Sequence, residues 1–250
     1  MTRFKDQLTP DAKLRGLWQS LATPYTAEIC ARAGFDWLLF DGEHAPNSLP
    51  LLLAQLQAVT PFNVCPIVRT PDDNPAVIKQ YLDIGFSTLL VPMVESATQA
   101  AEIVAATRFP PRGIRGVASA VSRASGFGAQ ADYLTTAHEN ITLILQIESK
   151  AGLAALDSIA ATPGVDALFI GPADLAASLG HLGNPRHADV QAAINQAFEQ
   201  IKQAGKPAGI FALSTEDAKA RLAQGFKFVS LGTDIGLLTA GAKNLLAQTS

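Results

Sequence analysis

The chain has 250 residues, of which 48% are hydrophobic and only 16% are charged, and its formal net charge is −3. No basic block is present, which argues against nucleic acid as a partner, and no apolar run approaches the roughly 20 residues of a membrane span. The N-terminus lacks the apolar core of a signal peptide, and Cys30 and Cys65 form neither a disulfide framework nor a zinc pattern, so we expect a protein of the reducing cytoplasm.

Eight short apolar strands are predicted in chain order: Gly16–Leu21, Phe35–Asp41, Cys65–Arg69, Thr88–Val94, Ile141–Ile147, Ala167–Ile170, Ala208–Leu213 and Phe226–Leu231. Helices are predicted between them, at 24–33, 48–59, 75–85, 96–108, 151–161, from 174 onward, at 188–204 and from 214 or 215 onward, and a last helix follows strand eight. This alternation without a linker predicts an α/β fold, a single (β/α)8 TIM barrel over residues 1–250.

A doubly wound sheet is the alternative fold, because it also alternates strands and helices. Its dinucleotide fingerprint needs a glycine-rich turn directly after a strand. The segment from Gly126 to Ala131 nearly matches that pattern, but no strand precedes it. We therefore expect no organic cofactor. The surrounding stretch Arg112–Asp132 has no clear period, and a loop of this length is usually functional or an interface.

Polar side chains follow several predicted strands where those strands end. In a barrel these ends meet at one face and build the active site. The polar tips also include Glu43 and Gln146, and the side chains expected to converge on one cavity are Asp41, His44, Arg69, Glu148 and Asp174. Gln146 and Glu148 are two residues apart in one strand, so they share a face of the sheet.

Glu148 and Asp174 come from two strand tips and together offer a hard oxygen site suited to Mg²⁺ or Mn²⁺. Two protein ligands leave positions open for water and substrate, as a catalytic metal site requires. The alternative is that both acids only cap helices. Gly171, Pro172 and Ala173 lead directly into a helix, whose free N–H groups could hold a carboxylate.

The remaining polar tips have both chemical and structural interpretations. His44 beside Asp41 is a plausible base with an orienting carboxylate. Arg69 at a buried tip could stabilise an oxyanion, or it could form a structural salt bridge to Asp41 or Glu43. Lys150 lies in the first turn of a helix, where a solvated lysine is common, so a Schiff-base mechanism is not favoured. His138, His181 and His187 are expected on the surface.

The chain resembles the class II pyruvate aldolases of the HpcH/HpaI family from about Gly16 to its C-terminus, and the nearest type is a 4-hydroxy-2-oxoheptanedioate aldolase. The resemblance rests on a spaced set of motifs: GFDWLLFDGEHAPN (Gly34–Asn47), LLVPMV (Leu89–Val94), PPRGIRGV (Pro110–Val117), QIES (Gln146–Ser149) and FIGPADL (Phe169–Leu175). It implies reversible retro-aldol cleavage of 4-hydroxy-2-oxo acids to pyruvate or hydroxypyruvate and an aldehyde, through a metal-stabilised enolate.

The resemblance also implies roles for individual residues. Glu148 and Asp174 would hold the divalent metal, which is Mg²⁺ or Mn²⁺ with Co²⁺ as a further option. His44 and Asp41 would form the catalytic dyad, with Arg69 as the catalytic arginine. The substrate contacts would come from Gln146, Gly171, Pro172, Ala173, Asp174, Trp18 and Phe211, with Phe211 placed where aldehyde selectivity is set.

The same resemblance implies a homohexamer built as a trimer of dimers that exchange their C-terminal helices, with the segment Gly113–Arg123 near a neighbouring subunit's site. Three other functions stay open. They are an acyl-CoA lyase of the citramalyl- or malyl-CoA type, a non-catalytic keto-acid-binding protein, and a Schiff-base aldolase. The acyl-CoA lyase needs a basic nucleotide-binding surface, and none is evident in the chain.

Overall fold

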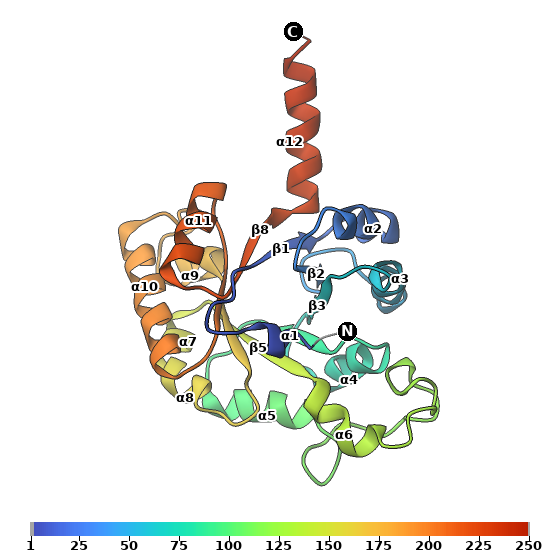
Figure 1. The fold of residues 1–250 in the computed structure, drawn as a ribbon. Coiled ribbons are helices and arrows are strands. Elements are labelled where there is room, and N and C mark those ends of the chain that lie inside the picture. Colours follow the sequence, from blue (N-terminus) through green and yellow to red (C-terminus); the bar gives the residue numbers. More distant parts are fainter. Residues whose placement is uncertain (1–2, 250) are drawn as a thin grey trace.

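A computed structural model describes residues 3–249 and contains a closed barrel of eight parallel strands in sequence order (Figure 1). The strands are β1 (Leu14–Gln19), β2 (Trp37–Asp41), β3 (Cys65–Arg69), β4 (Thr88–Val91), β5 (Thr142–Ile147), β6 (Ala167–Ile170), β7 (Ala208–Phe211) and β8 (Phe228–Thr233). Each strand pairs with its sequence neighbour, and β8 closes the ring on β1. The barrel prediction is confirmed, and the doubly wound alternative is wrong.

Helices surround the barrel on its outside (Figure 1). They are α1 (Phe4–Gln7), α2 (Pro24–Arg32), α3 (Leu49–Val59), α4 (Pro75–Asp83), α5 (Ala97–Thr107), α6 (Tyr133–Asn140), α7 (Lys150–Ala154), α8 (Leu156–Ala160), α9 (Pro172–Ser178), α10 (Ala188–Gln203), α11 (Thr215–Gln224) and α12 (Asp234–Ala247), with a 3₁₀ turn η1 (Arg123–Ser125). None of the helices in the described part of the chain combines the length and apolar character needed to cross a bilayer.

Several boundaries differ from the predicted ones for local reasons. β4 ends at Val91 rather than Val94, because Pro92 has no N–H and Met93 adopts a left-handed backbone with φ of 53°. The helix predicted at 151–161 is interrupted at Ala155, which leaves the helical conformation and separates α7 from α8. α9 begins at Pro172 rather than Asp174, because proline fits the first helical turn.

Most predicted helix starts are confirmed by a side-chain cap. Thr23, Asn74, Ser96 and Ser214 each accept a hydrogen bond from a backbone N–H in the first turn of their helix. Ser48 occupies the cap position of α3 but makes no capping hydrogen bond. Local sequence therefore predicts the residue at which most of these helices begin.

The barrel interior holds a separate apolar core that supports the site. This inner core contains Phe4, Trp18, Trp37, Leu39, Cys65, Ile67, Leu90, Ile144, Ala167, Phe169 and Phe228. Two strand glycines make room for its rings: a methyl group on Gly16 would lie 2.0 Å from Trp37, and one on Gly209 would lie 2.3 Å from Phe228. A larger apolar layer packs between the sheet and the helices.

The predicted loop 112–132 is anchored to the barrel rather than loosely attached. Arg115 is buried, pairs with Asp83 at 2.7 Å and donates to the Tyr133 hydroxyl at 3.0 Å. Its guanidinium also stacks on Phe109, with 4.5 Å to the ring centroid. The loop nevertheless exposes four large apolar side chains, Ile114, Val117, Val121 and Phe127.

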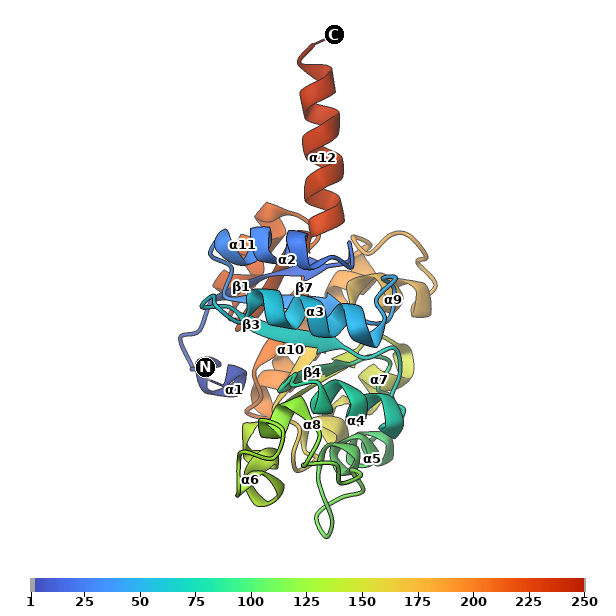
Figure 2. The same ribbon diagram turned by 90° about the vertical axis from the view of Figure 1, so that its right-hand side faces the viewer.

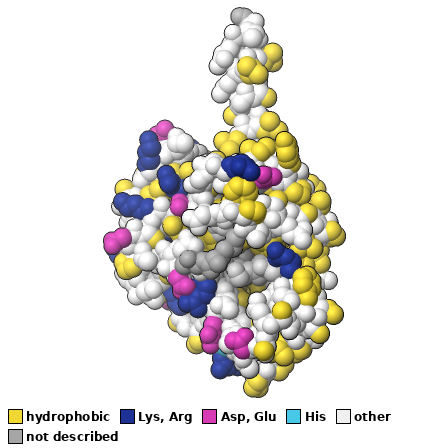
Figure 3. All heavy atoms as spheres, turned by 45° about the vertical axis from the view of Figure 1, so that its right-hand side comes forward, with side chains coloured by type: hydrophobic (Ala, Val, Ile, Leu, Met, Phe, Trp, Pro, Cys, Tyr) yellow, Lys and Arg dark blue, Asp and Glu magenta, His cyan; other side chains and the backbone are white. Residues whose placement is uncertain are grey.

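Helix α12 projects from the barrel instead of packing along it (Figures 1 and 2). Its root is fixed by Asp234, whose carboxylate accepts the N–H groups of Ser20 at 2.8 Å and Leu21 at 3.1 Å. Asp234 is the one buried residue of this helix, and the side chains of Ile235, Leu237, Leu238 and Leu245 are exposed. Figure 3 shows hydrophobic side chains gathered where the helix leaves the barrel.

Candidate active site

The predicted site residues lie on the inward-facing positions of the strands or directly after them. Inner-core residues such as Leu39, Ile67 and Ile144 point into the barrel, and side chains two positions apart share a face. The same alternation places Asp41, Arg69, Gln146 and Glu148 on the inward face at the carboxyl ends of β2, β3 and β5. Asp41 and Arg69 are also direct register partners on neighbouring strands.

Arg69 forms a buried ion-pair network with two acids. Its Nε and one terminal nitrogen donate to the two oxygens of Asp41, at 2.9 and 2.8 Å. The other terminal nitrogen lies 2.6 Å from Glu43 Oε2. The structural salt bridge considered for Arg69 is therefore present. A guanidinium has five N–H groups, and the two hydrogen bonds to Asp41 use two of them, while the Glu43 contact is an ion pair.

His44 lies at the mouth of the barrel, where two-thirds of its side chain, 67%, is exposed. Its imidazole Nε2 is 3.7 Å from Glu43 Oε1. Asp41 contacts His44 through the backbone, by accepting its N–H at 3.4 Å together with that of Glu43 at 3.0 Å. The Asp41 carboxylate thus binds Arg69 and the backbone of the turn that carries Glu43 and His44. Within residues 3–249 the carboxylate nearest to the His44 imidazole is that of Glu43.

Glu148 is a buried carboxylate directly after β5, with 2% of its surface exposed. One oxygen accepts the N–H of Met93 at 2.9 Å, and the other accepts a short hydrogen bond from the Gln146 side-chain amide. The pKa of Glu148 is raised to about 7, mainly by burial and in part by the charges of Asp174 and Glu43, while the Met93 N–H and the Arg69 charge lower it. The positive charge of Arg69, which is paired with Asp41 and Glu43, therefore does not outweigh burial and the two neighbouring acids.

Asp174 is exposed in the first turn of α9, close enough to Glu148 and Glu43 for its charge to raise the pKa of both. The pKa of Glu43 is raised mainly by burial. The cap of α9 is Gly171, and that of α7 is Ser149. Neither Glu148 nor Asp174 caps a helix, so the capping alternative is wrong for both acids.

The backbone of Gly171 passes close to the side chains of Glu148 and Gln146. A methyl group at this position would lie 2.3 Å from Glu148 Oε2 and 2.8 Å from the Gln146 side-chain nitrogen. The first hydrogen bond inside α9 runs from Leu175 N–H to the Gly171 carbonyl at 3.1 Å. In the described structure Ala173 and Asp174 come before Leu175, so their N–H groups belong to the first helical turn, which has no carbonyl partners within the helix. Such N–H groups are the donors that an anion seat requires.

Aromatic rings form one wall of the mouth. Trp18 lies under the Arg69 guanidinium, with 4.4 Å to the ring centroid, and meets Phe211 edge to face at 5.4 Å. Two buried polar atoms near these rings, Trp18 Nε1 and Gln146 Oε1, have no hydrogen-bond partner in the described structure. Such atoms are usually satisfied in proteins, so they are available to a bound ligand.

A divalent cation fits this group of residues. The charges of Asp174 and Glu43 both act on Glu148, while the Arg69 charge is already shared with Asp41 and Glu43. The donors Glu148 and Asp174 are hard oxygens, which Mg²⁺ and Mn²⁺ prefer. The absence of a side chain at Gly171 leaves room for the Glu148 carboxylate, which a methyl group there would meet at 2.3 Å.

Three supporting residues were not among the predicted site residues. Glu43 contacts Arg69 directly. Asn47 donates to the Asp41 carbonyl at 2.8 Å and thereby braces the turn that carries Glu43 and His44. Met93 presents its N–H to Glu148 from a left-handed backbone. The acidic side chain of Glu43 was visible in the sequence, but backbone conformation at Met93 has no sequence signal.

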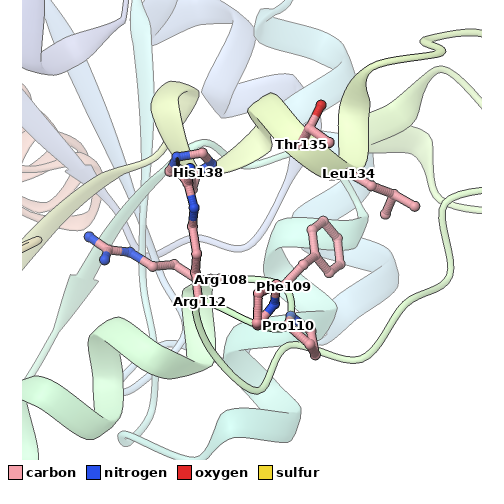
Figure 4. A pocket seen from close by; sticks show the side chains of 8 residues that line it. Arg108, Phe109, Pro110, Arg112, Leu134, Thr135 and His138 are labelled. Carbon is pink, nitrogen blue, oxygen red and sulfur yellow. Dashed lines mark hydrogen bonds between the residues drawn. The ribbon is translucent and has the colours of Figure 1, made fainter.

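The surface hollows of the protein include two at the opposite end of the barrel, where strands begin. One lies between the loop Phe109–Arg112 and α6, and is lined also by Arg108, Leu134, Thr135 and His138 (Figure 4). Another surrounds the start of β3 and includes Phe4, Cys65 and Arg123. Neither contains a predicted site residue.

Comparison with known proteins gives a consistent result. Residues 14–240 match the family described as HpcH/HpaI aldolase/citrate lyase. A hydroxypyruvate/pyruvate aldolase of Chromohalobacter salexigens is 50% identical over 245 residues, which is 98% of this chain and 96% of that protein. A 4-hydroxy-2-oxo-heptane-1,7-dioate aldolase of Klebsiella pneumoniae is also 50% identical over 245 residues, 98% of this chain and 92% of that protein.

A solved structure agrees with these relatives. The crystal structure of an HpcH/HpaI aldolase/citrate lyase family protein from Burkholderia cenocepacia superposes with a TM-score of 0.95 and 43% identity, and 98% of each chain is covered.

Proposed function

Because the chain belongs to the HpcH/HpaI aldolase/citrate lyase family and is a carbon–carbon lyase like its aldolase relatives, we propose that it cleaves 4-hydroxy-2-oxo acids reversibly. The products would be pyruvate or hydroxypyruvate and an aldehyde. The observation that carries this proposal is the buried carboxylate of Glu148 at the barrel mouth, next to Gly171 and close enough to Asp174 for the two charges to interact.

We propose that Glu148 and Asp174 hold a divalent cation, Mg²⁺ or Mn²⁺ with Co²⁺ as a further option. When bound, such an ion acts as a Lewis acid toward the keto oxygen and carboxylate of the substrate. The N–H groups of Ala173 and Asp174, after Gly171 and Pro172, would donate hydrogen bonds to that carboxylate. Gln146, whose amide oxygen has no partner in the described residues, would contact the substrate beside them.

Arg69 would donate from N–H groups that do not bind Asp41 to the oxygen at C2, where negative charge develops as the C3–C4 bond breaks. The bond's electron pair passes to the enolate of pyruvate, and the C4 oxygen becomes the aldehyde carbonyl. His44 would accept the C4 hydroxyl proton, through a water, and return a proton to C3. Asp41 positions both groups, since it binds Arg69 and accepts the His44 N–H.

Trp18 and Phe211 would bound the space for the aldehyde. Their edge-to-face contact gives one side of the mouth an apolar, rigid surface. Substitution of Phe211 by leucine should therefore alter the relative kcat/KM for aldehydes of different size more than it alters pyruvate exchange.

The test is product analysis of aldol addition. Pyruvate and hydroxypyruvate are each incubated with a panel of aldehydes, with Mg²⁺, with Mn²⁺ and with a chelator, using wild type, Glu148→Gln and the distant control His138→Ala. The proposal expects addition products that the chelator and Glu148→Gln abolish and that the control retains. Full activity in chelator, or inactivation by borohydride in the presence of pyruvate, would contradict the cation mechanism.

We also propose that two copies exchange α12 and that the assembly is a hexamer. The support is the exposed apolar side chains of Leu237, Leu238 and Leu245 on a helix that leaves the barrel, together with the exposed apolar residues of loop 112–132. A second copy would cover these surfaces.

The thiols Cys30 and Cys65 are free, which supports our proposal of a reducing compartment such as the cytoplasm.

A further inference from the structure

Two histidines and an aspartate meet where α9 passes into α10, outside the site described above. His181 Nε2 lies 3.3 Å from Asp189 Oδ2, and His187 Nδ1 lies 3.6 Å from the same oxygen. The two imidazoles stack with their centroids 3.6 Å apart and their planes inclined by 14°. Within residues 3–249 these three side chains are close enough together to hold one metal ion.

The distances match those between ligands of a single ion. Ligand atoms about 2.0–2.1 Å from a tetrahedral Zn²⁺ are about 3.3–3.4 Å from one another. The distances from Asp189 Oδ2 to the two imidazole nitrogens, 3.3 and 3.6 Å, lie at or near that value. Because the stacked rings have nearly parallel planes, at least one imidazole must turn about its side-chain bonds before both nitrogen lone pairs point at one ion. Asp189 is exposed and both histidines are partly exposed, which leaves room for that rotation.

The backbone holds the two histidines in place. His181 donates its N–H to the Ala176 carbonyl at 2.8 Å, Asn184 donates to the His181 carbonyl at 2.9 Å, and His187 donates to the Asn184 carbonyl at 3.1 Å. The turn also contains Gly183 in a left-handed conformation, with φ of 73°. Because the turn is braced at both ends, little ordering of the chain is needed to bind an ion.

We propose that His181, His187 and Asp189 form a second metal site, specific for a borderline transition-metal ion such as Zn²⁺. Imidazole nitrogens suit Zn²⁺, whereas the all-oxygen pair of Glu148 and Asp174 suits Mg²⁺ or Mn²⁺. Three protein ligands leave the fourth position to water. The bound ion replaces the 3.2 Å hydrogen bond from Asp189 N–H to His187 Nδ1 and ties the α9–α10 turn to the first turn of α10.

The experiment is a Zn²⁺ titration of chelator-treated, dialysed protein against a chromophoric chelator, in excess Mg²⁺. Wild type is compared with His181→Ala, His187→Asn and Asp189→Asn. Asparagine at 187 keeps a good helix cap while removing the imidazole. His138→Ala is the matched control, and each titration is repeated in a Glu148→Gln background. Circular dichroism confirms that every variant is folded.

Wild type, His138→Ala and Glu148→Gln should all bind a Zn²⁺ equivalent that Mg²⁺ does not displace. The three site variants should bind it at least 10–100-fold more weakly, since loss of even an outer-shell partner costs that much. Co²⁺ in place of Zn²⁺ should give the intense visible bands of a four-coordinate nitrogen-containing site, absent in His181→Ala. Equal Zn²⁺ affinity in wild type and folded His181→Ala would overturn the proposal, as would the absence of this equivalent in wild type.

Failure of the aldolase mechanism leaves a separate signature. In that case Glu148→Gln would retain activity, whatever the Zn²⁺ titration shows at the second site.

Discussion

Replacing Gly171 with alanine tests the close approach on which the proposed cation site depends. The backbone of Gly171 has φ of −98° and ψ of 95°, which alanine adopts without strain. The added methyl group would lie 2.3 Å from Glu148 Oε2, well inside ordinary contact. The carboxylate must therefore move by about 1 Å to restore a normal separation.

Glu148 has no free direction in which to move, because Met93 N–H holds one oxygen and the Gln146 amide holds the other. A misplacement of 1 Å at a reacting group can cost about 10²-fold in rate, which corresponds to about 2.7 kcal/mol at 1.36 kcal/mol for each tenfold change. We expect kcat/KM for the aldol reaction to fall by about 10²-fold and Mn²⁺ affinity to fall with it. Overpacking should cost a further about 1–3 kcal/mol of stability.

The assays are steady-state kinetics with saturating Mn²⁺, a Mn²⁺ binding titration, and chemical denaturation. His138→Ala is the control, since His138 lines a hollow at the opposite end of the barrel and, within the described residues, contacts none of the proposed site residues. The control should keep wild-type kinetics and Mn²⁺ affinity. If folded Gly171→Ala also kept both, the geometry assigned to Glu148 would be refuted.

Three further perturbations test other parts of the site. Arg69→Lys loses the two-pronged pairing with Asp41 and should lower kcat by about 10²–10³-fold; full activity in this variant and in Arg69→Ala would remove Arg69 from the mechanism. Burial raises the pKa of Glu148 to about 7, so the carboxyl of the cation-free protein is protonated below that pH. A cation binds the ionised form, and its affinity should fall about tenfold for each pH unit below 7; the Mn²⁺ titration should lose this dependence in Glu148→Gln, and a flat profile in wild type would contradict it. Leu238→Glu with Leu245→Glu places charge on the exposed face of α12 and should reduce the mass measured by light scattering, whereas an unchanged mass would exclude α12 from the interface.

The positions of the strand tips were predictable because they depend on alternation. Residues two apart in a strand share a face, so Gln146 and Glu148 were expected to point together. A parallel barrel brings the carboxyl ends of all strands to one face, which placed Arg69 near Asp41 without any knowledge of distances. Helix starts such as Thr23 and Ser96 were predictable for a similarly local reason, since a short polar side chain satisfies the free N–H groups beside it.

The pairing among the polar side chains was not predictable in the same way. Sequence placed Asp41 beside His44, but in the structure the two oxygens of Asp41 face the Arg69 guanidinium, and the imidazole is turned toward Glu43. A buried guanidinium requires carboxylate partners far more than an exposed imidazole does. His181 and His187 were expected on the surface as separate residues, yet the turn between α9 and α10 stacks them.

The sequence by itself therefore determined the barrel and the end of it at which polar side chains such as Asp41, Arg69 and Glu148 follow the strands. Each of these follows from periodicity and from local capping, which act over a few residues. Only the tertiary structure decided which acid neutralises which base, that Gly171 leaves room for the Glu148 carboxylate, and that α12 leaves the barrel. Those outcomes depend on desolvation and close packing between segments far apart in the chain, and no local pattern encodes them.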